Sequence, residues 1–344
     1  MVAALCKEIT IQKDFFGGDK ISTIYFGGGT PSLLTIDDCQ LLLEEIGKNY
    51  PVSAGAEITL EANPDDIDRG KLESWKSAGI NRLSIGIQSF FEEELQWMNR
   101  AHNAPQAKKC IEDSLAAGFQ NFSIDLIYGS PLLTDAMWEQ NVQTAIGYGI
   151  PHLSCYALTV EEKTPLHKQI SKAQKTDVDN EKQARQFLLL MEWLRKAGYE
   201  HYEVSNFAQP GMRSWHNSSY WRGEKYLGLG PSAHSFTGQS RQWNVANNNQ
   251  YIAALKNNNI PKEEEQLTET QKLNEYIMIT LRTKEGLDLA AIEQRCGLKK
   301  SESLQQQIVP YINSGLVKKN GMHLQLTDEG MLRADGIAAD LFSL

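Results

Sequence analysis

Short apolar runs alternate with longer amphipathic stretches through the first half of the chain. Residues 35–50, 68–79, 104–118 and 134–149 show the apolar spacing of helices, with Thr35 at an N-cap position and Gly79 at a helix end. Strand-like runs precede and follow them at residues 22–29, 56–64, 81–90, 121–131 and 151–160. This alternation predicts an α/β fold with a parallel sheet, either a barrel or a doubly wound sheet.

The pattern differs at both ends of this region. Residues 2–16 predict a helix with no strand before it, although a parallel barrel normally begins with a strand. Residues 179–208 predict a long helix followed by a strand, and the polar residues 247–267 have the composition of a linker. Three helices, a small hairpin and a final helix follow, which is the pattern of a winged-helix-like domain. We therefore divide the chain into a partial barrel (1–170), an extension of it (171–260) and a C-terminal winged-helix-like domain (261–344).

Composition limits which binding partners and which cellular location we expect. Of the 344 residues 41% are hydrophobic, which is enough for a large core, and the formal net charge is −9 without a long Lys/Arg run. Nucleic acid is therefore not expected as a partner, and we interpret the winged-helix-like domain as a scaffold. No apolar run approaches the ~20 residues of a membrane span and no signal-peptide pattern is present, so we expect a cytoplasmic protein.

The cysteines are scattered and odd in number. Cys6, Cys39, Cys110, Cys155 and Cys296 show no CxxC spacing, so a disulfide framework is not expected. We interpret each as a free thiol that packs as a small hydrophobic side chain, and we expect no cysteine-bound metal.

Polar residues and glycines stand where the predicted strands end, which is where parallel barrels carry their sites. Glycines at the first exit let a ligand approach the backbone, a carboxylate can accept from an ammonium or hydroxyl group, and an arginine can pair with a carboxylate. These features predict one common pocket, formed by Gly27, Gly28, Gly29, Thr30, Glu61, Gln88, Arg100 and Asp125. Alternatively, the glycines form only a turn, and Glu61 and Asp125 cap helices or act as the acid and base of a lyase or hydrolase.

The stretch RSWHNSSYWRG, residues 213–223, is the most unusual in the chain. It places a histidine and an asparagine beside three aromatic residues, with an arginine near each end. We expect neither a surface helix nor a plain core strand from this composition. It indicates a site for a flat, partly charged ligand, or else a hydrogen-bonded histidine inside an aromatic core.

Ordered motifs along nearly the whole chain resemble the coproporphyrinogen-oxidase-like radical SAM proteins. They are YFGGGTPSLL, LEANP, INRLSIGIQSF, Arg-x-His at residues 100–102, SIDLIYGSP and YLGLGPSAHSF. The resemblance implies a partial TIM-type (β/α)6 radical SAM barrel that binds S-adenosylmethionine (SAM) at its strand ends. It places Gly28, Gly29 and Thr30 at the methionine moiety of SAM, Glu61, Gln88, Arg100 and Asp125 along the rest of the site, and Ala157 near the adenine.

The motif HNSSYW resembles the HNxxYW pattern of one branch of this family, the HemW-type heme chaperones. The branch implies heme binding, with His216 as a ligand of the heme iron and Trp221 in contact with the macrocycle. Trp215 and Tyr220 offer further stacking surface, and Arg213 and Arg222 are candidates for the propionates. His234 is a second candidate ligand, whereas His102, His152, His167 and His201 are expected to be structural or exposed.

One departure from the family pattern is large. The family binds a [4Fe–4S] cluster through Cys-x3-Cys-x2-Cys after the first barrel strand, and this chain has neither that motif nor that strand. We therefore expect no cluster held by cysteines of this chain, no reductive cleavage of SAM by the family's route, and an exposed edge on the next strand.

The preferred function is that of a heme chaperone, which binds heme and delivers it to apo-hemoproteins of respiratory chains. Peripheral membrane association and a homodimer are further expectations from the resemblance. The alternative is an enzyme, oxygen-independent coproporphyrinogen III oxidase in porphyrin biosynthesis. A third class, a barrel lyase acting through Glu61 and Asp125, also stays open.

Overall fold

A seven-stranded sheet forms the centre of the molecule in the computed structural model, which describes residues 1–342. The strand order is β1-β2-β3-β4-β5-β7-β6; β1 to β5 run parallel, while β7 is antiparallel to both β5 and β6. The strands are β1 (Ile21–Phe26), β2 (Val52–Ala62), β3 (Arg82–Gln88), β4 (Phe122–Tyr128), β5 (His152–Ala157), β6 (Glu200–Glu203) and β7 (Asn206–Ala208). The predicted α/β partial barrel is confirmed, and β1 stands at one edge of the sheet.

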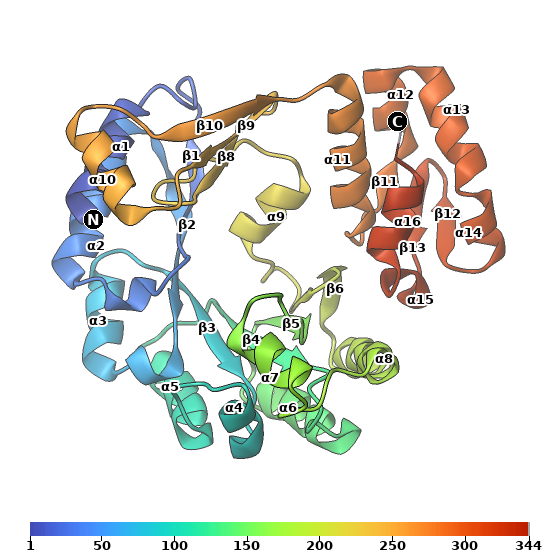
Figure 1. The fold of residues 1–344 in the computed structure, drawn as a ribbon, viewed down its shortest axis with the longest axis horizontal. Helices are drawn as coiled ribbons and strands as arrows, with labels where there is room; N and C mark the ends of the chain where they lie inside the picture. The colour runs from blue at the N-terminus through green and yellow to red at the C-terminus, as the bar shows by residue number, and fades with distance from the viewer. Residues whose placement is uncertain (343–344) are drawn as a thin grey trace.

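Helices link the parallel strands and pack on one face of the sheet (Figure 1). The expected N-cap at Thr35 is present: its hydroxyl accepts from the backbone N–H of Asp38, whose carboxylate accepts from the Thr35 N–H. The expected end of a helix at Gly79 also holds, with φ +102° at that glycine. The helices of this part are α1 (Val2–Ile11), α2 (Ile36–Asn49), α3 (Arg69–Ser77), α4 (Glu92–Trp97), α5 (Ala104–Ala116), α6 (Asp135–Gly147), α7 (Pro165–Ser171) and α8 (Asn180–Lys196), with 3-10 turns at Pro31–Leu33 and Pro64–Asp66.

The two faces of the sheet differ in polarity because successive residues of a strand point to opposite sides. In β3, Leu83, Ile85 and Ile87 are fully buried in the main core against the helices. The alternate residues of the strands face the other side and are mostly polar. On that inner face lie Thr23, Tyr25, Glu57, Thr59, Glu61, Asn63, Arg82, Ser84, Gln88, Ser123, Asp125, His152 and Ser154.

The segment predicted to be a linker is folded, so that interpretation was wrong. Residues 248–256 form α10 (Asn248–Lys256), in which Tyr251 and Leu255 are buried against Ala4 of α1. Residues 262–266 form β10 (Lys262–Gln266), an edge strand antiparallel to β9 (Ser240–Asn244), which pairs with β8 (His234–Phe236). The buried side chains of Tyr251 and Leu255 stabilise α10, and backbone pairing with β9 stabilises β10, in spite of the polar composition of this segment.

The C-terminal region forms a separate lobe to the right in Figure 1. Its three-stranded sheet has the order β11-β13-β12, as a winged-helix-like arrangement requires. Arg195 of α8 forms an ion pair with Asp328, at 2.6 Å, which joins this lobe to the barrel. The elements are α11 (Glu269–Leu281), β11 (Leu287–Asp288), α12 (Leu289–Cys296), α13 (Leu298–Gln307), α14 (Val309–Asn313), β12 (Val317–Asn320), β13 (His323–Leu326), α15 (Asp328–Met331) and α16 (Ala334–Asp340).

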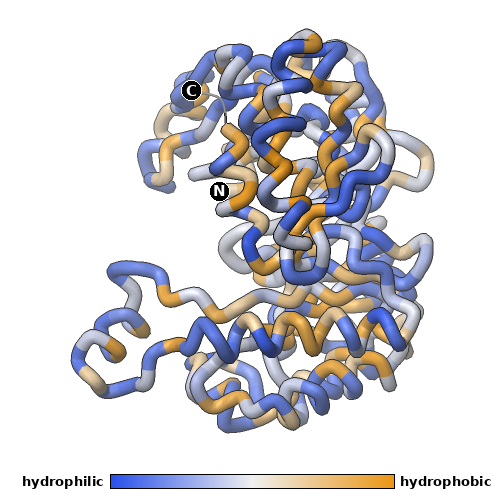
Figure 2. Tube along the Cα trace, turned by 90° about the vertical axis from the view of Figure 1, so that its right-hand side faces the viewer, coloured by the Kyte–Doolittle hydropathy of each residue, from blue (hydrophilic) through white to orange (hydrophobic). Residues whose placement is uncertain are grey.

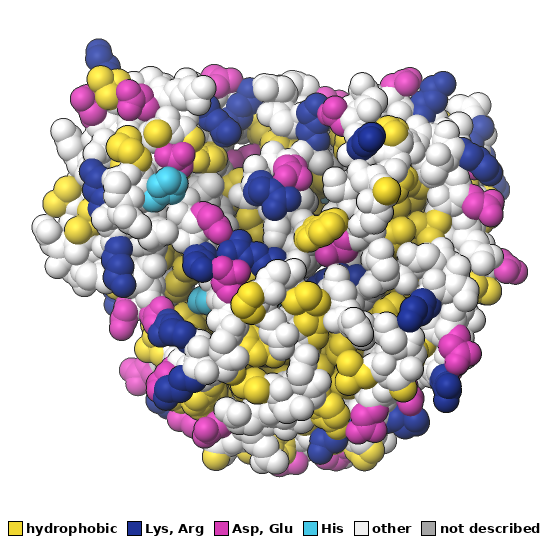
Figure 3. All heavy atoms as spheres, turned by 180° about the vertical axis from the view of Figure 1, so that it is seen from behind, with side chains coloured by type: hydrophobic (Ala, Val, Ile, Leu, Met, Phe, Trp, Pro, Cys, Tyr) yellow, Lys and Arg dark blue, Asp and Glu magenta, His cyan; other side chains and the backbone are white. Residues whose placement is uncertain are grey.

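Hydrophobic and hydrophilic residues alternate along the helices, as expected for elements with one buried side (Figure 2). On the face seen from behind, lysines and arginines are interspersed with aspartates and glutamates rather than gathered into one basic patch (Figure 3). In the described part of the chain, no helix combines the length and the apolar character needed to cross a membrane.

Candidate functional site

Glu61 is the centre of a hydrogen-bonded group at the carboxyl ends of β1 and β2. Its Oε1 accepts from the hydroxyl of Tyr25 at 2.7 Å, and its Oε2 accepts from the backbone N–H of Gly28 at 3.2 Å. A Cβ added to Gly27 would lie 2.4 Å from the ring of Tyr25 and 2.9 Å from Oε1 of Glu61. The glycine loop therefore lies directly against this carboxylate, and only glycine fits at position 27 without displacing its neighbours.

Arg100 and Gln88 lie together at the end of β3. The Nη2 of Arg100 donates to Oδ1 of Asn63 at 2.8 Å, while its buried Nε has no hydrogen-bond partner among the described residues. A Cβ added to Gly86 would lie 2.9 Å from Nε2 of Gln88 and 3.4 Å from Nη2 of Arg100. The two side chains thus close around one glycine, and the unpaired Nε provides a donor for a ligand.

Asp125 belongs to the same polar face. Burial, and then the negative charge of Glu61, raise the pKa of Asp125 to about 7, against the opposing effects of Ser154, Arg82 and Arg100. A carboxyl group that is partly protonated near neutral pH can both donate and accept hydrogen bonds. Ala157 differs from the other predicted residues, because its side chain packs against the core on the outer face and only its backbone is available to a ligand.

This group fits the amino, carboxylate and ribose functions of SAM, whereas the cysteines do not fit a [4Fe–4S] cluster. The described cysteines are all free and lie on different elements, α1, α2, α5, β5 and α12. Burial raises the pKa of Cys39, Cys110 and Cys155, although a cluster is held by thiolates. Among the described residues, no group of three or more His, Cys, Asp or Glu side chains could hold a metal ion.

The stretch 213–223 forms α9 (Trp215–Trp221), a short and partly exposed helix. The expectation that this composition does not form a surface helix was wrong: 53% of Trp215 and 38% of Tyr220 are exposed. Ser214 is the N-cap, and its hydroxyl accepts from the backbone N–H of Asn217. His216, Ser219 and Tyr220 share the side of the helix that lines a cavity, as their spacing of three and four residues requires.

The imidazole of His216 is held on three sides. Its Nδ1 is 2.9 Å from the hydroxyl of Thr23, its Nε2 is 3.1 Å from the hydroxyl of Tyr220, and its ring stacks on Tyr25. Burial, and then the positive charge of Arg82, lower the pKa of His216 to about 4. The ring is therefore neutral at physiological pH, the form in which histidine binds a metal.

A cavity of about 1520 Å³ lies between α9 and the edge of β1. This volume exceeds the roughly 300–1,000 Å³ typical of small-molecule pockets. The glycine loop, including Gly27 and Gly28, also lines it, so it reaches from the strand ends to His216. Apolar side chains form one wall, namely Leu5, Ile9, Ile24, Phe26, Leu227 and Leu229.

Not every predicted heme residue reaches this cavity. Trp221 faces away from it, with its ring 5.5 Å from the guanidinium carbon of Arg282. Arg213 is also outside, held by ion pairs to Glu200 at 2.7 Å and Glu285 at 2.9 Å. Arg222, by contrast, lines the cavity.

The other histidines lie where structural or exposed roles would place them, and His167 is exposed. His234 is exposed and lines the same cavity as His216. His102 and His152 are buried, with Nε2 bonded to the Ile87 carbonyl and the Tyr202 hydroxyl, and His201 stacks on the ring of Phe207.

Three residues that contact His216 or its helix are not predicted from the motifs: Thr23, Tyr25 and Glu57. Glu57 accepts from the backbone N–H groups of Trp215 and His216. A signal for them exists in the strand alternation, since positions 23 and 25 share a face with Gly27, and position 57 shares a face with Glu61. The alternation predicts on which face of the sheet these side chains lie, but it does not predict that they contact His216 or α9.

The sequence and fold are similar to those of characterised proteins. The model of the radical SAM superfamily matches residues 7–145, and that of the HemN C-terminal domain matches residues 267–333. Heme chaperone HemW of Mycobacterium tuberculosis is 32% identical over 339 residues, which cover 98% of this chain and 85% of that protein. Heme chaperone HemW of Bacillus subtilis is 31% identical, with coverage of 92% and 84%.

Among solved structures, coproporphyrinogen III oxidase HemN of Escherichia coli, described as a radical SAM enzyme, superposes with a TM-score of 0.84. The match covers 99% of this chain and 82% of that chain at 23% identity, so it shows the shared fold. The two HemW relatives are more similar in sequence to this chain than HemN is, at 31–32% against 23% identity. The chain belongs to the HemW family of radical SAM proteins.

Proposed function

We propose that this protein is a heme chaperone that binds heme in the cavity between α9 and β1, with Nε2 of His216 as the iron ligand. The observation that carries the proposal is the state of His216, a neutral imidazole held at the wall of a large cavity. The name heme chaperone, borne by the HemW relatives, points to the same function.

The contacts of His216 favour iron binding through Nε2. When Nδ1–H donates a hydrogen bond to the hydroxyl oxygen of Thr23, Nε2 is unprotonated and has the lone pair that binds iron. The hydroxyl of Tyr220 then donates to Nε2, at 3.1 Å. Heme binding requires Tyr220 to move away from this nitrogen, so we expect its ring to contact the macrocycle after that movement.

The walls of the cavity match the two kinds of surface that heme presents. The apolar wall formed by α1, β1 and residues 227–229 suits the faces of the macrocycle. Lys20, Arg222 and Lys225 line the same cavity and offer cations to the propionates. Arg222 and Lys225 already pair with Glu224 and Asp19, so the propionates would compete with these carboxylates.

We further propose that SAM binds at the strand ends, through Gly28, Gly29, Thr30, Glu61, Gln88, Arg100 and Asp125. Glu61 is placed to accept from an ammonium group, and the buried, unpartnered Nε of Arg100 to donate to a carboxylate. In the radical SAM superfamily, a bound SAM supplies radical chemistry together with an iron–sulfur cluster. The residues of this chain hold and orient the ligand at the sheet, and the cluster's ligands are not among the described residues.

We propose apo-hemoproteins of respiratory chains as recipients of the heme, in the cytoplasm or at the membrane surface. Support comes from the function named for the relatives and from a site that is open to solvent at α9, where Trp215 is 53% exposed. A histidine whose Nε2 already has an alternative partner, Tyr220, suits release as well as capture. We propose that a homodimer of this chain carries out the transfer, as the resemblance to the family implies.

The decisive experiment is a heme titration followed by absorbance on three proteins: the unchanged chain, His216→Ala and His234→Ala. The two histidines line one cavity, so each variant controls for the other. We expect loss of affinity and an altered spectrum only in His216→Ala. Unchanged affinity and spectrum in His216→Ala would overturn the heme proposal for this residue. Turnover of coproporphyrinogen by the chain would favour the oxidase instead.

A further inference from the structure

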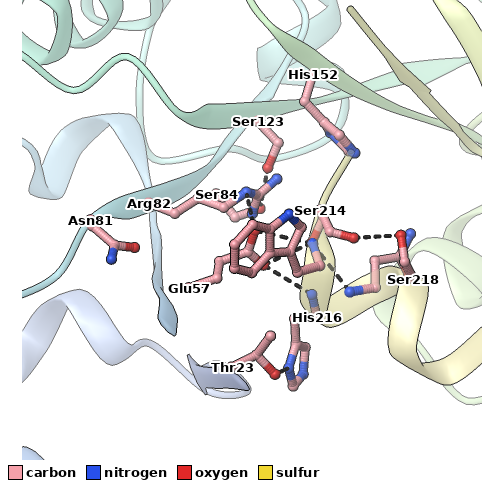
Figure 4. Close-up of polar contacts among 12 residues, drawn as sticks. Thr23, Glu57, Asn81, Arg82, Ser84, Ser123, His152, Ser214, His216 and Ser218 are labelled. Atoms are coloured by element: carbon pink, nitrogen blue, oxygen red, sulfur yellow. Dashed lines mark hydrogen bonds and ion pairs between the residues drawn. The ribbon is translucent and has the colours of Figure 1, made fainter. Parts of the chain in front are cut away.

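We infer that Glu57, with its charge balanced by Arg82, is the positioning residue that fixes His216 in the heme cavity from inside the sheet. This inference rests on the proposed heme function of His216. Glu57 lies on β2 and Arg82 on β3, whereas the ring of His216 lies beside Thr23 of β1 (Figure 4).

The carboxylate of Glu57 holds the first turn of α9. Its Oε1 accepts from the backbone N–H of His216 at 2.9 Å and from the hydroxyl of Ser214 at 3.3 Å, and its Oε2 accepts from the backbone N–H of Trp215 at 3.0 Å. The N–H groups of a first helical turn have no partner within the helix, and a carboxylate is a strong acceptor for them. Glu57 therefore determines where α9 begins.

Arg82 offsets the cost of burying the carboxylate of Glu57 inside the protein. Glu57 is 4% exposed and Arg82 is 2% exposed, and Nε of Arg82 lies 3.8 Å from Oε2 of Glu57. A buried carboxylate without a cation nearby would favour its protonated form or another position. Arg82 thus places a positive charge beside the carboxylate of Glu57 and helps to hold it against the first turn of α9.

His216 is consequently fixed at both ends. Its backbone N–H is bonded to Glu57 of β2, and its ring is bonded to Thr23 and stacked on Tyr25 of β1. α9 has only seven residues, from Trp215 to Trp221, and none of them is fully buried. A helix this short has little stability of its own, so its position depends on such contacts with the sheet.

The test compares heme binding by Glu57→Ala with that by a matched control, Glu94→Ala. Glu94 is another fully buried carboxylate, on α4, which accepts from Ser130 at 2.5 Å and does not line the cavity. We expect Glu57→Ala to weaken heme binding by roughly tenfold to a hundredfold and to shift the heme spectrum toward that of His216→Ala. Glu94→Ala should lower thermal stability without changing the spectrum of the bound heme.

A second variant can be used for the same test if Glu57→Ala does not fold. Glu57→Gln combined with Arg82→Met removes both buried charges and retains one oxygen that accepts from α9. We expect this double variant to fold and to bind heme more weakly than the unchanged chain, with a partly shifted spectrum. Unchanged affinity and spectrum in a folded Glu57 variant, with His216→Ala defective, would refute the inference alone. If His216→Ala is also unchanged, the proposed heme site fails and the inference fails with it.

Discussion

The imidazole of His216 lies nearly parallel to the ring of Tyr25, with the ring centroids 4.6 Å apart and the planes inclined by 13°. The hydroxyl of the same tyrosine donates to Glu61 at 2.7 Å. One side chain of β1 therefore contacts both the proposed iron ligand and the carboxylate at the centre of the proposed SAM site. The two proposed sites are therefore neighbours, and Tyr25 is a residue in contact with both.

Tyr25→Phe should separate the two contacts of this residue. The substitution keeps the ring against His216 and removes the donor to Glu61, so we expect heme affinity within about twofold of the original and SAM affinity about fivefold weaker, as for one lost hydrogen bond. Titrations with heme and with SAM measure the two effects. Tyr25→Leu removes the ring contact as well and should change the heme spectrum. Equal losses of heme affinity in both variants would contradict the assigned roles.

Thr23→Val should weaken heme binding while leaving the fold intact. The valine has nearly the shape of threonine but cannot accept from Nδ1 of His216, so the orientation and tautomer of the ring are no longer fixed. Loss of such a partner of a metal-binding histidine typically costs about 10–100-fold in affinity.

A matched threonine provides the control. Thr59 lies on the same face of the neighbouring strand, and its buried hydroxyl has no hydrogen-bond partner in the described structure. Thr59→Val should therefore be neutral or stabilising and should bind heme normally. A similar loss of heme affinity in both variants would show that the effect arises from the sheet rather than from the bond to His216.

The sequence predicted the parallel strands and the strand-end residues because both depend on local patterns. Alternation of apolar and polar positions identifies β3 and β4, and glycine or polar residues at strand exits identify the face that carries a ligand. The structure brings Gly28 and Glu61 into contact, and it places Gln88 and Arg100 around one glycine. Their binding of SAM stays a prediction.

The helix α9 and strand β10 could not be predicted from their own residues. The first turn of α9 is held by Glu57, which precedes His216 by 159 positions, and no pattern within residues 213–223 contains that information. Strand β10 has the sequence KEEEQ with every residue exposed, so its strand conformation depends mainly on backbone pairing with β9. Contacts between distant segments decided both elements.

Two buried titratable groups, His216 and Asp125, should change the free energy of unfolding in opposite directions as the pH changes. The pKa of His216 is about 4 instead of its ordinary 6.5, so between these values the unfolded chain takes up a proton that the folded chain does not. The free energy of unfolding should therefore fall as pH falls through this window, by up to about 1.4 kcal/mol per pH unit. Burial raises the pKa of Asp125 from 3.8 to about 7. Its contribution to the free energy of unfolding is therefore present at low pH and is lost as the pH rises toward 7.

Urea unfolding at a series of pH values from about 4 to 7 measures these contributions. His216→Phe removes the first group, so stability should rise less steeply with pH than in the unchanged chain. Asp125→Asn removes the second, so stability should rise more steeply. Parallel curves for all three proteins would mean that neither group titrates differently in the folded and unfolded states.

Gly27→Ala should disrupt both sites by steric contact alone. The backbone at Gly27 is not in the left-handed region, but a Cβ there would lie 2.4 Å from the Tyr25 ring and 2.9 Å from Glu61. Either side chain must move, so we expect weaker SAM binding and a changed heme spectrum, with a loss of about 1–3 kcal/mol in stability. Gly47→Ala in α2 is the control, because a Cβ there meets nothing within 4 Å and alanine favours a helix. Titrations of both variants with heme and with SAM measure the effect. Normal binding of both ligands by Gly27→Ala would show that the glycine loop shifts without moving Tyr25, which would contradict the assigned contact.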